Sequence, residues 1–99
     1  MRVHYLPDVN KSEEHETLQR AVKGYAPEPY YEWRDYQSRA IAKLVANGDE
    51  VRLVEVTAAE FVDYCNRIGV RCDMAALTGF LWDKGKRLKV RGQSNAERP

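Results

Sequence analysis

The chain of 99 residues is poor in the features that mark several common protein classes. It has only two cysteines, whereas small disulfide-stabilised secreted scaffolds are dense in cysteine. No apolar run approaches the ~20 residues that a membrane-spanning helix needs, which excludes an integral membrane protein. The N-terminal residues lack the apolar core of a signal peptide. We therefore expect a cytoplasmic protein without a membrane partner.

Net charge is also nearly absent. Sixteen Lys and Arg against fifteen Asp and Glu leave a charge of +1, so no global field draws the protein to a charged partner. The apolar share of 43% and the charged share of 31% are ordinary for a globular chain and argue against a wholly disordered one. The length suits a single domain, which we expect over residues 1–91, followed by a disordered tail over 92–99.

Motifs of catalysis and metal binding are missing. The chain has no Gly-x-Ser-x-Gly and no His-Glu-x-x-His. Cys65 and Cys72 do not form a Cys-x-x-Cys pair, and neither His4 nor His15 has a second ligand at the usual close spacing. We expect His15 at the surface of a helix, and we expect no enzymatic activity, no cofactor and no metal. A thiol or metal enzyme is the weakest alternative.

Helix and strand signals alternate along the chain. Helices are indicated by apolar residues at helical spacing and by capping residues, among them the capping box Thr57-Ala58-Ala59-Glu60. Gly85 is expected to end the last helix. The expected helices cover residues 12–23, 31–47, 57–68 and 73–84. Alternation and β-branched residues predict strands, which cover residues 2–6, 51–56 and 87–91.

These elements predict an α+β fold, with about four helices packed on a small two- or three-stranded, mainly antiparallel sheet. An all-helical core with a marginal hairpin is the alternative. The predicted core consists of Val3, Leu18, Val22, Trp33, Ile41, Leu44, Leu53, Val56, Phe61, Cys65, Ile68, Leu77, Phe80, Leu81 and Val90.

Aromatic residues are concentrated in one segment, because five of the ten lie within residues 25–36. Tyrosine and tryptophan are enriched at binding interfaces, where they bury a large area and keep a polar tip. The segment therefore predicts a partner-binding loop made of Tyr25, Tyr30 and Tyr31. In the alternative interpretation, Trp33 and Tyr36 begin a core stripe and the loop tyrosines pack over it.

Basic residues gather near the C-terminus, in a patch made of Lys84, Lys86, Arg87, Lys89 and Arg91. The patch is typical of a surface that binds phosphates or an acidic protein, but cations also protect an edge strand from aggregation. Helices 57–68 and 73–84 with the basic strand also suggest a winged helix. The second helix, however, offers no Arg, Asn or Gln before Lys84 to read bases.

The features above indicate a small non-catalytic protein of the accessory or inhibitor type, which binds another protein by occupying its surface. A phage or mobile-element accessory protein would have this size and composition. The alternative is a nucleic-acid-binding module, either winged-helix-like or backbone-binding, that uses the basic patch. A DNA-binding role and a protein-binding role both remain open at this point.

Overall fold

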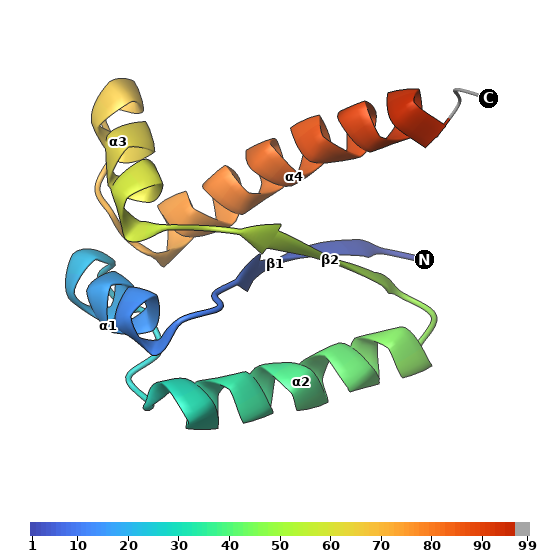
Figure 1. Ribbon diagram of the computed structural model, residues 1–99, viewed down its shortest axis with the longest axis horizontal. Helices are drawn as coiled ribbons and strands as arrows, with labels where there is room; N and C mark the ends of the chain where they lie inside the picture. The colour runs from blue at the N-terminus through green and yellow to red at the C-terminus, as the bar shows by residue number, and fades with distance from the viewer. Residues whose placement is uncertain (97–99) are drawn as a thin grey trace.

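The computed structural model describes residues 1–96, and this part of the chain forms four helices and a two-stranded sheet (Figure 1). The elements in chain order are β1 (Val3–Asp8), α1 (Ser12–Ala21), α2 (Tyr30–Ala46), β2 (Glu50–Glu55), α3 (Ala58–Ile68) and α4 (Met74–Ala96). In this range no helix combines the length and the apolar character needed to cross a membrane. The expected α+β class with about four helices is confirmed.

The two strands run parallel, with Val3 beside Glu50 and Asp8 beside Glu55. The expectation of a mainly antiparallel sheet is therefore wrong. Two helices, α1 and α2, separate the strands in the sequence and return the chain to the end of the sheet where β1 began. A connection of this length and kind joins parallel strands, whereas antiparallel neighbours need only a short turn.

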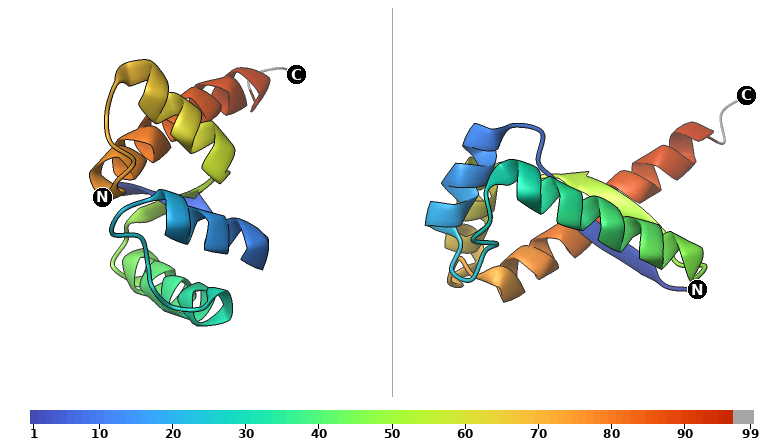
Figure 2. Two further views of the ribbon diagram at one scale, coloured as in Figure 1. Left: turned by 90° about the vertical axis from the view of Figure 1, so that its left-hand side faces the viewer. Right: turned by 90° about the horizontal axis from the view of Figure 1, so that it is seen from below.

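The helices lie on both faces and at one end of the sheet. α4 packs on one face and α2 on the other, while α1 and α3 start at the carboxyl end of the strands and pack against each other (Figure 1 and Figure 2). The most deeply buried side chains come from α1, α3 and α4, with Leu18, Phe61 and Leu77 at 0% exposure. The core therefore sits at the carboxyl end of the sheet.

Burial matches the predicted core in part. The predicted residues that are buried are Leu18, Val22, Val56, Phe61, Cys65, Leu77, Phe80 and Leu81. The prediction is wrong for Leu53 and Ile68, because their exposed fractions are 50% and 52%. Those that are only partly buried are Val3, Trp33, Ile41 and Leu44, and the side chain of Val90 lies outside the described residues. Buried residues that the prediction missed are Val9, His15, Tyr25, Tyr30, Val54 and Ala58.

α4 runs without a break from Met74 to Ala96, so the expected strand at 87–91 is helical. Gly85 lies inside the helix instead of ending it. A Cβ atom at Gly85 would stand 2.2 Å from Cδ1 of Tyr5, so only glycine lets α4 cross β1 this closely. Residues 92–96 of the expected tail belong to α4, and 97–99 lie outside the described residues.

On each strand, a backbone carbonyl that points away from the other strand accepts a hydrogen bond from a helix side chain. The Glu50 N–H donates to the Arg2 carbonyl at 2.8 Å, and the alternation along both strands then turns Pro7 and Glu55 outward. Gln37 Nε2 of α2 donates to the Pro7 carbonyl at 2.7 Å, and Lys84 Nζ of α4 donates to the Glu55 carbonyl at 2.6 Å. These bonds block part of each open edge against an added strand.

Candidate functional site

The carboxyl edge of the sheet is the first place to look for a ligand site, because α/β proteins bind ligands there. A hollow of about 240 Å³ at this edge is lined by Asp8, Asn10, Lys11, Glu14, Glu55, Val56 and Thr57. Three of these residues are acidic, which disfavours an anionic ligand. Among the described residues, no group of three or more His, Cys, Asp or Glu side chains is placed to hold a metal ion.

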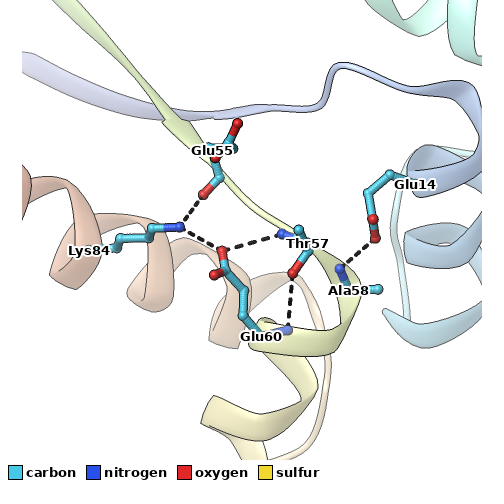
Figure 3. Close-up of polar contacts among 6 residues, drawn as sticks. All are labelled: Glu14, Glu55, Thr57, Ala58, Glu60 and Lys84. Carbon is cyan, nitrogen blue, oxygen red and sulfur yellow. Dashed lines mark hydrogen bonds and ion pairs between the residues drawn. The ribbon is translucent and has the colours of Figure 1, made fainter.

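The N-terminus of α3 faces this hollow, and the N–H groups of Thr57, Ala58 and Glu60 bond to protein side chains (Figure 3). The Thr57 hydroxyl accepts from the Glu60 N–H at 3.2 Å, and the Glu60 carboxylate accepts from the Thr57 N–H at 3.3 Å. This geometry confirms the capping box. The Glu14 carboxylate of α1 accepts from the Ala58 N–H at 2.7 Å. Protein carboxylates thus fill the place that a phosphate would take, and the edge is a structural junction.

Lys84 belongs to the same junction. Its ammonium group donates to the Glu55 carbonyl and to the Glu60 carboxylate, both at 2.6 Å, and its side chain is only 21% exposed (Figure 3). Two of the three donors of this ammonium group are thus already used within the fold. The first residue of the basic patch therefore helps to hold α4 against α3 and β2.

The helical form of 87–91 also divides the basic patch. A strand would place Arg87, Lys89 and Arg91 on one face, whereas a helix places positions 84, 87 and 91 on one side and positions 86 and 89 on another. Lys86 lies over the Trp82 ring, with Nζ 4.8 Å from the ring centroid, and Arg87 is exposed. The side chains of Lys89 and Arg91 fall outside the described residues.

The three tyrosines of the predicted binding loop differ in burial. Tyr25 and Tyr30 are 8% and 9% exposed and pack over the core, as in the alternative interpretation, whereas Tyr31 is 80% exposed. The core position that the same interpretation gave Tyr36 is wrong, because Tyr36 is 47% exposed. The Tyr30 hydroxyl donates to the Val9 carbonyl at 2.7 Å. Burial, with a smaller effect from Tyr30, raises the pKa of Tyr25 to about 12. Only Tyr31 of the three therefore presents its ring to solvent.

His15 lies in the core, so the expectation of a surface position is wrong. Its ring is enclosed by those of Tyr25, Tyr30 and Trp33, at centroid distances between 5.2 and 5.6 Å. Nε2 lies 2.8 Å from the Glu28 carbonyl, which can only accept, so this nitrogen carries the proton. Nδ1 lies 3.5 Å from the Tyr25 hydroxyl. His15 thus ties α1 to the segment that leads into α2.

The cysteines are both free thiols, with Cys65 buried and Cys72 half-buried. Burial raises the pKa of the Cys65 thiol to about 11, and a hydrogen bond with Cys72 adds to the rise. The thiolate is the nucleophilic form of cysteine. At neutral pH Cys65 therefore holds its proton, and its environment is that of a core residue.

An open groove follows the outer side of the α3–α4 hairpin, and we call it the hairpin groove. One part, of about 530 Å³, is lined by Tyr64, Ile68, Val70, Arg71, Asp73, Ala75, Ala76 and Gly79. A second part, of about 440 Å³, is lined by Tyr64, Arg67, Ile68, Asp83, Lys86 and Arg87. The two parts share Tyr64 and Ile68, so they adjoin along the hairpin.

The two ends of the hairpin groove differ in chemistry. The end near the α3–α4 turn is apolar, and Ile68 and Val70 are 52% and 45% exposed there. The other end carries the cations Arg67, Lys86 and Arg87. The sequence analysis placed Ile68 in the core and did not find this groove, and no local sequence signal marked Ile68 or Val70 as exposed.

Comparisons of the chain with known proteins found no match. No family model matches the chain, and neither the curated proteins nor the solved structures contain a match to it. The fold, the closed carboxyl edge and the hairpin groove are therefore the basis for assigning a function.

Proposed function

We propose that the protein is a small non-catalytic protein-binding protein, which acts by occupying the surface of a partner. The observation that carries this proposal is the hairpin groove, where Ile68 and Val70 stay about half exposed beside an open hollow. Exposed apolar side chains gathered at a hollow mark interaction sites, because a partner that covers them removes apolar surface from water.

The shape of the groove supports recognition of a folded segment. Two helices that diverge from a short turn form a channel, and an amphipathic helix laid into such a channel is a common mode of peptide recognition. The carboxyl edge of the sheet is less suited to a ligand, since the Ala58 and Glu60 N–H groups and Lys84 already bond within the protein. The absence of catalytic motifs in the sequence also supports a binding role.

Nucleic-acid binding is the alternative, and the four cations between positions 86 and 91 of α4 favour it. Its winged-helix form requires a strand at 87–91, where the structure has a helix. Its backbone-binding form requires cations free to reach phosphates, and Lys84 is held within the fold. We therefore rank protein binding first.

A capture experiment with two matched double variants tests the proposal. Ile68→Ser/Val70→Ser removes the apolar groove residues, and Val45→Ser/Leu53→Ser removes two residues of similar exposure, 57% and 50%, on α2 and β2. Tagged protein is exposed to a lysate of the cells that encode it, with and without nuclease. We expect the wild type and the Val45/Leu53 variant to capture a nuclease-resistant protein and the Ile68/Val70 variant to lose it.

Two results would contradict the proposal. Capture that disappears with nuclease would favour the nucleic-acid alternative. Equal capture by both double variants would place the binding surface elsewhere on the molecule.

A further inference from the structure

We infer that the hairpin groove binds an acidic amphipathic helix of another protein, with apolar side chains at the turn end and carboxylates at the cationic end. The inference rests on the proposed function and names the chemistry of the partner. It follows from the space, the charges and the spacing of the residues that line the groove.

The apolar end has room for side chains of a guest helix. The hollow at this end measures about 530 Å³ and is widely open to solvent, so a guest helix would lie along it with one side exposed. On the α4 side the wall consists of the small residues Ala75, Ala76 and Gly79, and the Tyr64 side chain reaches across from α3 to the Asp83 carboxylate. A Cβ atom at Gly79 would meet only the Tyr64 hydroxyl, at 3.9 Å, so a guest can contact α4 on the turn side of Tyr64, over Ala75 and Ala76.

The cationic end carries three cations, Arg67, Lys86 and Arg87, and a single lining carboxylate, that of Asp83. Asp83 accepts a hydrogen bond from the Tyr64 hydroxyl at 3.2 Å. Arg67 pairs with Asp63 on its own helix at 3.2 Å, with both side chains mostly exposed. Exposed pairs of this kind contribute little, so Arg67 can exchange its partner for a guest carboxylate. The excess of positive charge is complementary to an acidic guest.

The spacing along α4 fixes the pattern of the guest. Gly79 and Lys86 are seven positions apart on one helix, which is two turns and roughly 10 Å at 1.5 Å per residue. A guest helix that follows α4 would thus carry its apolar residues about two turns away from its acidic residues. A nucleic-acid backbone fits less well, because the apolar end offers a phosphate no cation except Arg71 and presents the carboxylate of Asp73.

Two labelled helical peptides test the inference directly. Both carry the same leucines at helical spacing in one half; the other half carries glutamates in the first peptide and lysines at the same positions in the second. Fluorescence anisotropy measures their binding to the full chain at low and at high salt. We expect the acidic peptide to bind at least about tenfold more tightly than the basic one, with a preference that shrinks as salt screens the charges.

Two matched charge-reversal variants test whether the preference for the acidic peptide arises at the cationic end of the hairpin groove. Lys86→Glu/Arg87→Glu should reverse the preference for the acidic peptide. Arg39→Glu/Lys43→Glu on α2, where both residues are also exposed, should leave the preference in place. Circular dichroism of each variant establishes that α4 is retained.

The inference and the proposed function fail in different ways. Equal or tighter binding of the basic peptide, or binding of neither peptide, would overturn the acidic-helix inference. The capture experiment then decides the proposed function separately, because it depends on Ile68 and Val70 and on no assumption about the charge of the partner. An unchanged preference in the Lys86/Arg87 variant would also overturn the inference.

Discussion

Lys84 connects three elements through one ammonium group. It reaches from α4 to the Glu60 carboxylate at the start of α3 and to the Glu55 carbonyl at the end of β2. Glu60 also completes the capping box of α3, so one carboxylate serves the helix start and the contact between the helices. The same two helices are also joined by the rings of Phe61 and Tyr64 against Phe80, so Lys84 is one of several contacts that hold the hairpin together.

The capping box contributes to stability at a single residue. Thr57→Ala removes the acceptor of the Glu60 N–H and should lower the free energy of unfolding by about 1 kcal/mol. Thr78→Ala is the control, because its exposed hydroxyl only bonds back to the Met74 carbonyl within α4 and its loss should change stability by less than about 0.5 kcal/mol. Equal midpoints of chemical denaturation for Thr57→Ala and wild type would refute the role of the cap.

Two adjacent tyrosines should respond differently to truncation. Tyr30 is buried and bonds the Val9 carbonyl, so Tyr30→Ala should cost about 3 kcal/mol or more. Tyr31 is 80% exposed, and Tyr31→Ala should change stability by less than about 0.5 kcal/mol. Thermal melts of both variants measure the difference. Similar decreases in the melting temperature of the two variants would contradict a structure in which Tyr30 is buried and Tyr31 is exposed.

Alkaline pH should expose the burial of Tyr25. The pKa of its hydroxyl is raised from 10.0 to about 12. Between these pH values the hydroxyl ionises in the unfolded chain but stays protonated in the folded chain. The contribution of this group to the free energy of unfolding is therefore complete below pH 10 and is lost as the pH rises toward 12. Tyr25→Phe should make the free energy of unfolding fall less steeply over this interval. Parallel pH profiles for the variant and the wild type would argue against a buried hydroxyl.

At the scale of elements, the sequence predicted helix bounds correctly where capping residues and helical spacing determine them. The bounds of α2 and α3 lie within one residue of those expected, because capping residues and helical spacing act within a few residues of each other. The same reasoning failed at 87–91, where five alternating residues are too few to distinguish a strand from a helix. Gly85 resembled a helix end, but its role is set by Tyr5, eighty positions away.

The hairpin groove was beyond sequence reasoning for a similar reason. Whether Ile68 faces the core or solvent depends on how α3 sits against α4, and contacts distant in sequence, such as that between Lys84 and Glu60, fix this arrangement. The burial of Tyr25 likewise depends on His15, which local pattern placed at the surface. The carboxyl-edge capping box, by contrast, was visible in four consecutive residues.

Gly79 and Gly85, two of the glycines in α4, should give opposite results. Gly85→Ala forces the Tyr5 ring to move and should destabilise the protein by about 1–3 kcal/mol. Gly79→Ala meets no atom closer than 3.9 Å and should stabilise it by up to about 1 kcal/mol through helix propensity. Denaturant titration of both variants is the measurement. Stabilisation by both would mean that α4 does not cross β1 closely at Gly85.

At the scale of the whole molecule, charge is divided along the chain. Residues 1–50 carry seven cations and nine anions, and residues 51–99 carry nine cations and six anions. The sheet lies between α2 and α4, so the acidic half contributes one covering helix and the basic half the other (Figure 2). α2 itself carries three cations and two anions, so the division of charge along the chain does not make the two covering helices opposite in sign.

This distribution leads to a prediction for nucleic acid. Because net charge is near zero and Lys84 is engaged, we expect labelled duplex DNA to show no binding at micromolar protein and low salt. If binding occurs through the patch, log affinity should fall against log salt with a slope near −4, and Lys89→Ser/Arg91→Ser should reduce that slope by about two. Such a result would restore the nucleic-acid alternative.

The parallel pairing of β1 with β2 also constrains how the chain folds. Val3 pairs with Glu50, 47 positions later, so half of the chain must be gathered before the first rung of the sheet forms. Closing so long a segment costs entropy that local helix formation does not repay, and folding should be slower than in a helical bundle of this size. During synthesis, β1 leaves the ribosome long before its partner strand exists. Until β2 follows, its hydrogen-bonding groups are open to other chains, and the N-terminal strand is the segment most exposed to misassembly.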